Sequence, residues 1–212
     1  MTLLAVLAGY LIGSLPTGLL VIRALRGVDI RTVGSGNVGA TNVYRVAGLP
    51  VALLVLLIDA LKGAAPVLLA RAWAPAPWVE VLAGLAAIVG HNWSVFMRFA
   101  GGKGIAASFG VLSALSPVAA GVALGVWLVV VAVTRYASLA SLLAIASVPV
   151  VMIWRGEPAD HVTFGVVALA FALYRHRGNI ARLRAGTELR VTDPASPGLP
   201  GASAGHNAGK GG

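Results

Sequence analysis

The chain alternates between long apolar runs and short polar segments rich in glycine and arginine. A helix needs about 20 apolar residues to cross a bilayer, and fewer where neighbouring protein shields it. On this basis the sequence predicts seven membrane-spanning helices, several of them short: Leu3–Ile22, Pro50–Ala70, Val79–Phe96, Ile105–Leu115, Pro117–Val133, Leu139–Ile153 and His161–Leu173. The fourth run is the shortest and ends at Pro117, which by itself suggests a re-entrant or partial span.

Composition supports a membrane protein. Of the 212 residues, 58% are hydrophobic and 11% are charged, whereas a soluble domain carries about 25% charged residues. We therefore expect an all-α integral membrane protein, built as a compact bundle of seven transmembrane helices with glycine-rich loops on the cytoplasmic side. The chain contains 0 cysteines, which excludes disulfides and thiolate catalysis, and the histidines are not clustered, so no metal site is predicted.

The formal net charge of +9 reflects cations that sit at the ends of apolar runs rather than in a nucleic-acid-binding stripe. Lysine and arginine accumulate in short cytoplasmic loops. The even-numbered loops carry only Arg71 and Arg155, and the other cations lie in the odd loops and after the last span: Arg23, Arg26, Arg31, Arg45, Arg98, Lys103, Arg135, Arg175, Arg177, Arg182, Arg184 and Arg190. This places the N-terminus outside and the C-terminus in the cytoplasm. Merging the fourth and fifth segments into one crossing would move the last cluster outside, so seven crossings are preferred to six.

The ends of the chain complete the predicted organisation. The run Leu3–Ile22 has no basic n-region and no clear small-residue cleavage site, so it is expected to remain as a helix and not to act as a removable signal peptide. Residues 1–193 form one polytopic membrane domain. Residues 194–212 have almost no apolar bulk to bury and are predicted to be a disordered cytoplasmic tail.

The first polar segment, Arg31–Arg45, is small and glycine-rich and lies directly beside a span. Small residues let backbone N–H groups approach an anion, hydroxyl and amide side chains add donors, and an arginine grips phosphate oxygens in a bidentate manner. The segment therefore predicts a phosphate site, although a flexible interfacial turn is the alternative. Its candidate binding residues are Gly34, Ser35, Gly36, Asn37, Thr41, Asn42 and Arg45.

The second polar segment, Gly90–Ser108, contains Lys103 flanked by Gly101, Gly102 and Gly104 at the start of a predicted helix. Bare backbone donors and a cation at a helix N-terminus favour an anion, while a purely topogenic lysine is the alternative. His91 lies late in the third span. Ionisable groups at such depth usually face the bundle interior or a wet cavity, which favours a functional role.

The third polar segment, Tyr174–Glu188, places His176 and Asn179 on one helix face. In isolation it is an ordinary basic cap for anionic lipid headgroups, and Glu188 beside its arginines is expected to form a local ion pair. All three segments are predicted on the same side of the membrane, however, so together they indicate one site. In the second span, Asp59 and Lys62 are spaced to form a buried ion pair, with substrate contact as the alternative.

Taken together, the motifs resemble the bacterial acyl-phosphate:glycerol-3-phosphate acyltransferases, the PlsY family. The motifs are GSGNVGATNVYR, GHNWSVF followed by GGKG, and HRGNI followed by AGTE, and the likeness runs from Gly13 to Glu188. The resemblance implies a seven-helix inner-membrane enzyme that uses no cofactor or metal. Such an enzyme transfers a fatty acyl group from acyl phosphate to the 1-hydroxyl of sn-glycerol 3-phosphate, giving lysophosphatidic acid and phosphate. This reaction is the first step of phospholipid synthesis, between enzymes that make acyl phosphate and enzymes that acylate lysophosphatidate.

The resemblance also implies roles for individual residues. Ser35 and Arg45 match the first motif, Lys103 the second, and His176 and Asn179 the third, with His91 where the family also has a histidine. The expected catalytic residues are therefore Ser35, His91, Lys103, His176 and Asn179, and the other candidates bind substrate. Gly178 stands where a larger polar residue is common in the family.

Three questions stay open at this level. The proton of the attacking hydroxyl could pass to His91 or to substrate phosphate. An acyl-enzyme on Ser35 competes with direct transfer. A small organic-anion transporter is the alternative from another functional class, because interrupted helices and intramembrane charges also mark transport sites. Against it, the chain shows no internal repeat and its polar segments lie on one side.

Overall fold

The computed structural model describes residues 1–195, and all regular structure in that range is helical. Residues 196–212 of the predicted disordered tail lie outside the described range. The helices are α1 (Thr2–Gly13), α2 (Thr17–Arg26), α3 (Ala40–Ala47), α4 (Leu49–Trp73), α5 (Pro77–Asn92), α6 (Ile105–Leu115), α7 (Pro117–Thr134), α8 (Ala137–Trp154), α9 (Ala159–Arg175) and α10 (Arg177–Arg184). Two 3-10 turns cover Ile30–Thr32 and Val95–Met97.

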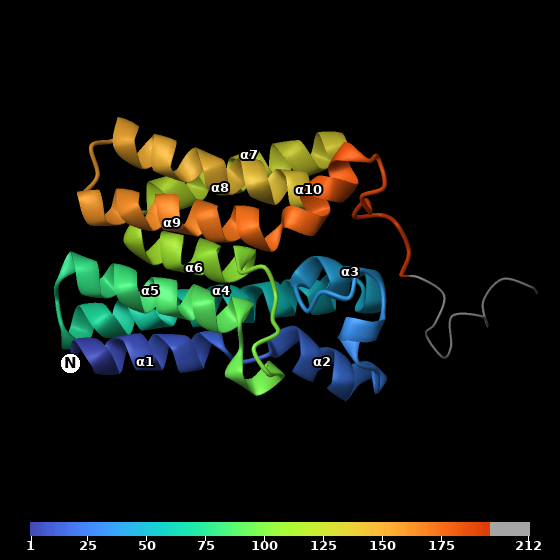
Figure 1. Cartoon of the computed structure of the whole chain (residues 1–212), viewed down its shortest axis with the longest axis horizontal. Coiled ribbons are helices and arrows are strands. Elements are labelled where there is room, and N and C mark those ends of the chain that lie inside the picture. Colours follow the sequence, from blue (N-terminus) through green and yellow to red (C-terminus); the bar gives the residue numbers. More distant parts are fainter. Residues whose placement is uncertain (196–212) are drawn as a thin grey trace, which may run out of the picture.

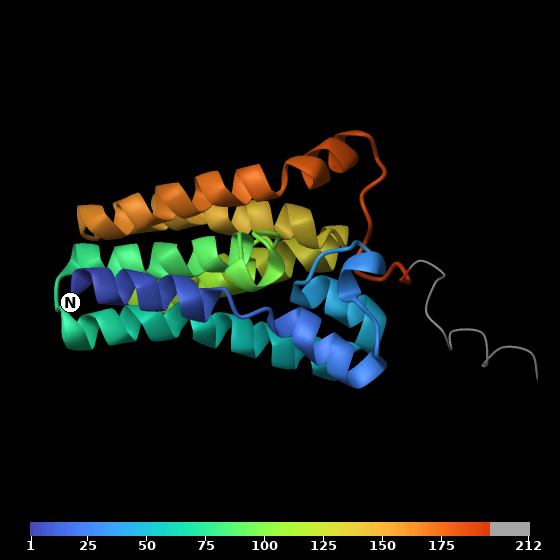
Figure 2. The same cartoon turned by 60° about the horizontal axis from the view of Figure 1, so that its bottom comes forward.

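The long helices run side by side along one axis (Figure 1). The N-terminus and the turn between α8 and α9 lie at one end of the bundle, and α2, α3 and α10 lie at the other (Figures 1 and 2). The first and third polar segments of the sequence thus meet at the same end, far from the N-terminus.

Five segments are long and apolar enough to cross a membrane: Thr2–Arg26, Leu49–Trp73, Pro77–Met97, Pro117–Thr134 and Ala137–Trp154. Helix α6 is apolar but has only 11 residues, and α9 has 17. The prediction of an all-helical membrane bundle is confirmed. The count of seven crossings stays a prediction, because it depends on these two shorter helices.

The predicted first span is present as the apolar segment Thr2–Arg26, but its helix is interrupted between α1 and α2. Pro16 has no N–H to donate and disfavours helical backbone at Leu15. The freed carbonyls find partners inside the protein: Leu15 O accepts from Lys62 Nζ at 2.7 Å and Ser14 O accepts from Ser94 Oγ at 2.5 Å. The break is therefore satisfied internally, as the membrane requires.

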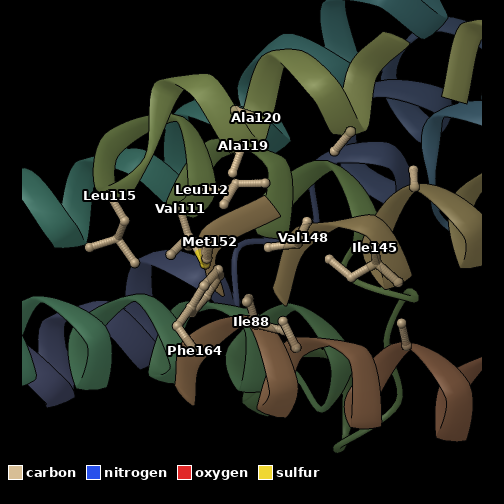
Figure 3. Close-up of a cluster of buried hydrophobic side chains, with 14 of the residues drawn as sticks. Ile88, Val111, Leu112, Leu115, Ala119, Ala120, Ile145, Val148, Met152 and Phe164 are labelled. Carbon is tan, nitrogen blue, oxygen red and sulfur yellow. The ribbon is translucent and has the colours of Figure 1, made fainter. Parts of the chain in front are cut away.

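The main apolar core lies where α5, α6, α7, α8 and α9 meet (Figure 3). Its buried side chains include Ile88, Val111, Leu112, Leu115, Ile145, Val148, Met152 and Phe164. On the other side of α6, a Cβ on Gly63 would collide with the backbone of Ala107, and a Cβ on Gly110 with the backbone of Ala60. Small residues at such contacts let membrane helices approach closely, and here they hold the short helix α6 in place.

Gly110→Val is expected to destabilise the bundle because the new side chain pushes α6 away from α4. Overpacking of this kind costs about 1 to 3 kcal/mol, which for a chain of this size lowers Tm by roughly 3 to 10 °C. Thermal unfolding of the detergent-solubilised protein measures the change. Gly121→Val is the matched control, because a Cβ at this position on α7 has no described heavy atom within 4 Å, and equal losses of Tm in the two variants would contradict the packing argument.

Candidate active site

A cavity of about 450 Å³ joins the polar segments to the membrane helices. Its polar lining comes from all three segments and includes Ser35, Asn37, Thr41, Arg45, Lys103, His176, Asn179, Arg182 and Glu188. Its apolar lining comes from α4 and from α6 to α8 and includes Leu53, Leu56, Phe109, Leu112, Ala123, Leu124, Trp127, Ala144 and Ile145. One cavity therefore offers cationic and hydrogen-bonding groups together with an apolar lining.

Most of the site residues expected from the sequence line this cavity. In addition to those named above, Asn42, His91 and Gly104 contribute to the lining, whereas Gly34, Gly36, Gly101 and Gly102 do not. The lining also includes Asp59, Ser138, Arg182 and Glu188, which were not among the expected site residues. The charges of Asp59, Arg182 and Glu188 were visible in the sequence, whereas nothing local indicated that Ser138 faces the cavity.

The first segment is organised around the buried side chain of Asn42. Its Nδ2 donates to the carbonyls of Val33 at 3.0 Å, Asn37 at 2.9 Å and Ile30 at 3.3 Å, and its Oδ1 accepts from Ser35 N at 2.9 Å. The sequence predicted that the side-chain amide of Asn42 donates to an anion, whereas in the structure this amide donates to backbone carbonyls. A fixed turn, and not a flexible one, presents Ser35.

The two glycines beside Ser35 have positive φ angles, +59° at Gly34 and +70° at Gly36. Only glycine adopts this region readily. These glycines allow the chain to fold back around Asn42, and their contribution to the site is the conformation of the turn.

Arg45 extends from α3 between the cavity and the C-terminal segment. Its Nη2 donates to Arg190 O at 2.8 Å and to Leu189 O at 3.5 Å, while its buried Nε has no hydrogen-bond partner within residues 1–195. Figure 2 shows the segment after α10 turning back toward α3. Burial lowers the pKa of Arg45 from its usual value, but a guanidinium stays charged at neutral pH.

The second segment is held in place by its neighbours. Arg175 donates through Nε to Gly102 O at 2.9 Å and through Nη2 to Gly101 O at 2.8 Å, and Gly102 N donates to His91 O at 3.1 Å. A Cβ on Gly102 would collide with the imidazole of His91. Gly101 and Gly102 therefore serve close backbone packing that presents the next residue, Lys103, to the cavity.

Lys103 lies directly before the N-terminus of α6. Gly104, with φ +78°, is the N-cap, and no side chain caps the helix, so the positive end of α6 and the ammonium lie next to each other in the cavity lining. Burial, reinforced by the nearby arginines and opposed by Glu188, lowers the pKa of Lys103 to about 8. An anion bound here would gain from both the charge and the helix end.

His176 is buried at the junction of α9 and α10. Its Nδ1 lies 2.8 Å from Ala172 O, and since a carbonyl only accepts, Nδ1 carries the hydrogen. The other ring nitrogen, Nε2, is left with a lone pair. Burial, together with the charge of Lys103, lowers the pKa of His176 to about 4, so the imidazole is neutral at physiological pH.

Glu188 gathers three donors at the edge of the cavity. Its Oε1 accepts from Asn179 Nδ2 at 2.5 Å and from Ser138 Oγ at 2.8 Å, and its Oε2 accepts from Arg182 Nε at 2.8 Å. Burial acts to raise the pKa of Glu188, but these hydrogen bonds outweigh it and hold the pKa below its usual value. The expected local ion pair is confirmed, and it also orients Asn179.

A family model described as glycerol-3-phosphate acyltransferase matches residues 3–186, a range that includes nearly all of the three polar segments. The chain belongs to the glycerol-3-phosphate acyltransferase family. The resemblance predicted from the motifs is thus confirmed at the level of the family.

Individual members of the glycerol-3-phosphate acyltransferase family support the assignment. The protein of that name from Desulforudis audaxviator (strain MP104C) is 51% identical over 183 residues, which cover 86% of this chain and 92% of that protein. The one from Myxococcus xanthus (strain DK1622) is 49% identical over 191 residues, 90% of this chain and 100% of that protein.

Two solved structures of PlsY (YgiH), an integral membrane glycerol 3-phosphate acyltransferase, are similar to this member of the family. The glycerol 3-phosphate form matches with a TM-score of 0.85 and 43% identity, and the lysophosphatidic acid form with 0.83 and 42%. Each match covers 89% of this chain and 94% of the other. The bundle is thus the integral membrane fold of that protein.

In this family member, Asn42→Ala is expected to loosen the first segment. It removes four hydrogen bonds and leaves buried backbone groups unsatisfied, at about 1 to 3 kcal/mol for each group. Hydrogen exchange of residues 30–42 should increase by at least tenfold. Asn37→Ala is the matched control, since Asn37 Oδ1 accepts only from Gly39 N, at 2.8 Å, and unchanged exchange in the Asn42 variant would contradict the organising role.

Proposed function

We propose that this protein transfers a fatty acyl group from acyl phosphate to the 1-hydroxyl of sn-glycerol 3-phosphate, giving lysophosphatidic acid and inorganic phosphate as the first step of phospholipid synthesis. The observation that carries the proposal is the single cavity with a cationic part and an apolar part. An acyl phosphate and lysophosphatidic acid both combine an anionic head with a hydrocarbon chain. The solved relatives, named for glycerol 3-phosphate and lysophosphatidic acid forms, agree with this choice.

The two phosphate-bearing substrates need two anion sites. Lys103, the N-terminus of α6 and Ser35 form the first, which we assign to the acyl phosphate because α6 continues from there into the apolar lining. Arg45, His176 and Asn179 form the second, for glycerol 3-phosphate. The fatty chain of the donor then lies among the apolar side chains of α4 and of α6 to α8.

In the reaction, the 1-hydroxyl oxygen of glycerol 3-phosphate attacks the carbonyl carbon of the acyl phosphate. A new C–O ester bond forms, the bond between the acyl carbon and the phosphate oxygen breaks, and phosphate leaves with the electron pair. Because phosphate is a good leaving group, placement of the reactants and stabilisation of the developing oxyanion by Lys103 and Ser35 supply most of the catalysis.

The hydroxyl proton is assigned to substrate phosphate. Neutral His176 presents Nε2 as an acceptor that orients the hydroxyl, but with a pKa of about 4 it is a weak base. A phosphate monoester has a second pKa near 6, which already exceeds that of His176. The phosphate oxygen that separates from the acyl carbon gains negative charge as the bond breaks and becomes a stronger base still. The departing phosphate therefore takes up the proton and leaves as hydrogen phosphate.

Direct transfer is favoured over an acyl-enzyme on Ser35. A nucleophilic serine needs an adjacent base, and within residues 1–195 no side chain hydrogen-bonds Ser35 Oγ, while Ser35 N is held by Asn42. An acylated Ser35 trapped by rapid quench and mass spectrometry would overturn direct transfer.

We assign the protein to the bacterial inner membrane, with the N-terminus outside and the cavity toward the cytoplasm. Arg23, Arg45 and Arg182 belong to the helices at the cavity end of the bundle, whereas Arg71 and Arg155 lie at the turns of the opposite end (Figure 1). This distribution follows the positive-inside rule.

The decisive assay follows phosphate release from palmitoyl phosphate by the purified protein in a lipidic medium. Release should depend on glycerol 3-phosphate, and Arg45→Ala should lower kcat/KM about 10- to 100-fold, because a charge-assisted contact to phosphate is lost. Arg184→Ala, an exposed residue outside the cavity lining, is the matched control. If folded wild-type protein releases no phosphate from palmitoyl phosphate and forms no lysophosphatidic acid from acyl-CoA, but takes up labelled glycerol 3-phosphate into sealed liposomes, it is a transporter.

The reaction should lose rate at alkaline pH. The ammonium of Lys103 is the form that binds phosphate, and with a pKa of about 8 it is protonated below that pH and lost as the pH rises through it. We expect kcat/KM to fall about tenfold per pH unit above 8. Lys103→Arg keeps its charge over this range, so its profile should lack this alkaline limb, and an identical limb in the variant would contradict the assignment.

A further inference from the structure

A buried ionisable cluster beside the cavity has no step assigned to it in the proposed reaction: Asp59, Lys62 and His91, of which Asp59 and His91 also line the cavity. Their exposed fractions are 2%, 5% and 6%. The predicted ion pair is present, with 2.8 Å between Lys62 Nζ and Asp59 Oδ1, and His91 Nδ1 lies 3.9 Å from the same oxygen. Charges at this depth are costly and are rarely kept without a function.

On one side, the cluster holds the first polar segment through the helix break. Lys62 Nζ donates to Leu15 O at 2.7 Å, directly before α2 begins. Helix α2 then touches the first segment, because Gly18 lies so close to the carbonyl of Val38 that a Cβ would collide with it. A change in the position of Lys62 would therefore move Leu15 and α2, and through Gly18 it would move the turn that carries Ser35.

On the other side, the cluster holds the second polar segment. The imidazole of His91 lies against Gly102, and its backbone carbonyl accepts from Gly102 N at 3.1 Å. Lys103 is the next residue. Asp59 lies between these two connections, close to Lys62 and His91, and both Asp59 and His91 reach the cavity lining.

We propose that Lys62 and Asp59 are positioning residues that set the placement of the first segment, with Ser35, relative to the second, with Lys103. The inference rests on the proposed function, in which these two segments act on one acyl phosphate. Reacting groups must approach to about 3 to 3.5 Å, and a misplacement of about 1 Å can cost 100-fold in rate. We therefore expect Lys62 and Asp59 to act on kcat through the two segments that they position.

The main variant is the double substitution Asp59→Asn with Lys62→Met. It removes both charges together, so that no buried charge is left without its partner, a change that often has little effect on stability. Leu15 O loses Lys62 but keeps the N–H of Thr17 as a donor, at 3.0 Å. We expect Tm close to wild type, one glycerol 3-phosphate site per chain, KM within about threefold, and kcat per binding site lowered about 100-fold. Lys62→Arg, whose guanidinium can serve both oxygens, should recover most of the rate.

The matched control removes a second ion pair of α4, in which an arginine also donates to a backbone carbonyl, as Lys62 does. Arg71 Nη2 lies 2.7 Å from Glu80 Oε2 and 2.9 Å from Ala114 O, away from the cavity lining. Arg71→Met with Glu80→Gln should leave kcat per binding site unchanged, whatever it does to Tm.

A readout independent of activity follows the distance between the two segments. Because the chain has 0 cysteines, spin labels on Thr32→Cys and Ala100→Cys, both exposed, report this distance by pulsed electron resonance. We expect the distribution to shift or broaden in the Asp59/Lys62 double variant. Gly18→Ala keeps the ion pair but displaces α2 from Val38, so the distance distribution should also change in this variant. It replaces the double variant in the test if the double variant does not fold.

The outcomes separate the two proposals. Wild-type kcat per site and an unchanged label distance in the double variant would overturn the positioning role. Absence of turnover in wild type would overturn the proposed function, while the label distances would still decide whether the cluster places the two segments.

Discussion

Backbone groups inside a hydrocarbon layer have no water to bond with, so a membrane helix can be broken only where the protein itself satisfies the freed donors and acceptors. The polar cavity of this protein depends on such breaks. Lys62 and Ser94 bind the carbonyls freed between α1 and α2, and Arg175 binds those of the glycine stretch before α6. Asn42 does the same for the turn of the first segment. Each polar side chain that holds a break thereby also fixes a part of the site.

The short helix α6 connects this polar architecture to the membrane. Close contacts at Gly63 and Gly110 hold it against α4, and its N-terminus lies in the cavity lining beside Lys103. One element therefore places a positive helix end and apolar side chains, such as Phe109 and Leu112, in the same cavity lining. In the proposed function, this arrangement combines phosphate binding and lipid binding in one small cavity.

Electrostatics prepare the cavity for anions. Burial of Arg45 and Lys103 disfavours their charges and lowers both pKa values, and a bound phosphate would reverse this effect. Glu188 offsets part of the positive charge, and its low pKa reflects the donors Asn179, Ser138 and Arg182. His176 stays neutral between these groups and keeps a lone pair. In the proposed function, the cations bind phosphate and the neutral groups orient the substrates.

Local sequence determined the class of fold, the apolar helices and the three polar segments, because hydropathy over about 20 residues and glycine-rich composition are local properties. The spacing of Asp59 and Lys62 likewise predicted their ion pair, since neighbours on one helix face are set by local geometry. Only the tertiary structure decided the break at Pro16, the use of Asn42 and Gly102 for backbone packing, and the place of Asp59 and Glu188 at the cavity. These features depend on contacts between residues far apart in the chain, such as Lys62 with Leu15 and Arg45 with Arg190. No local pattern encodes which side chain will meet a freed carbonyl, because that depends on how the helices pack.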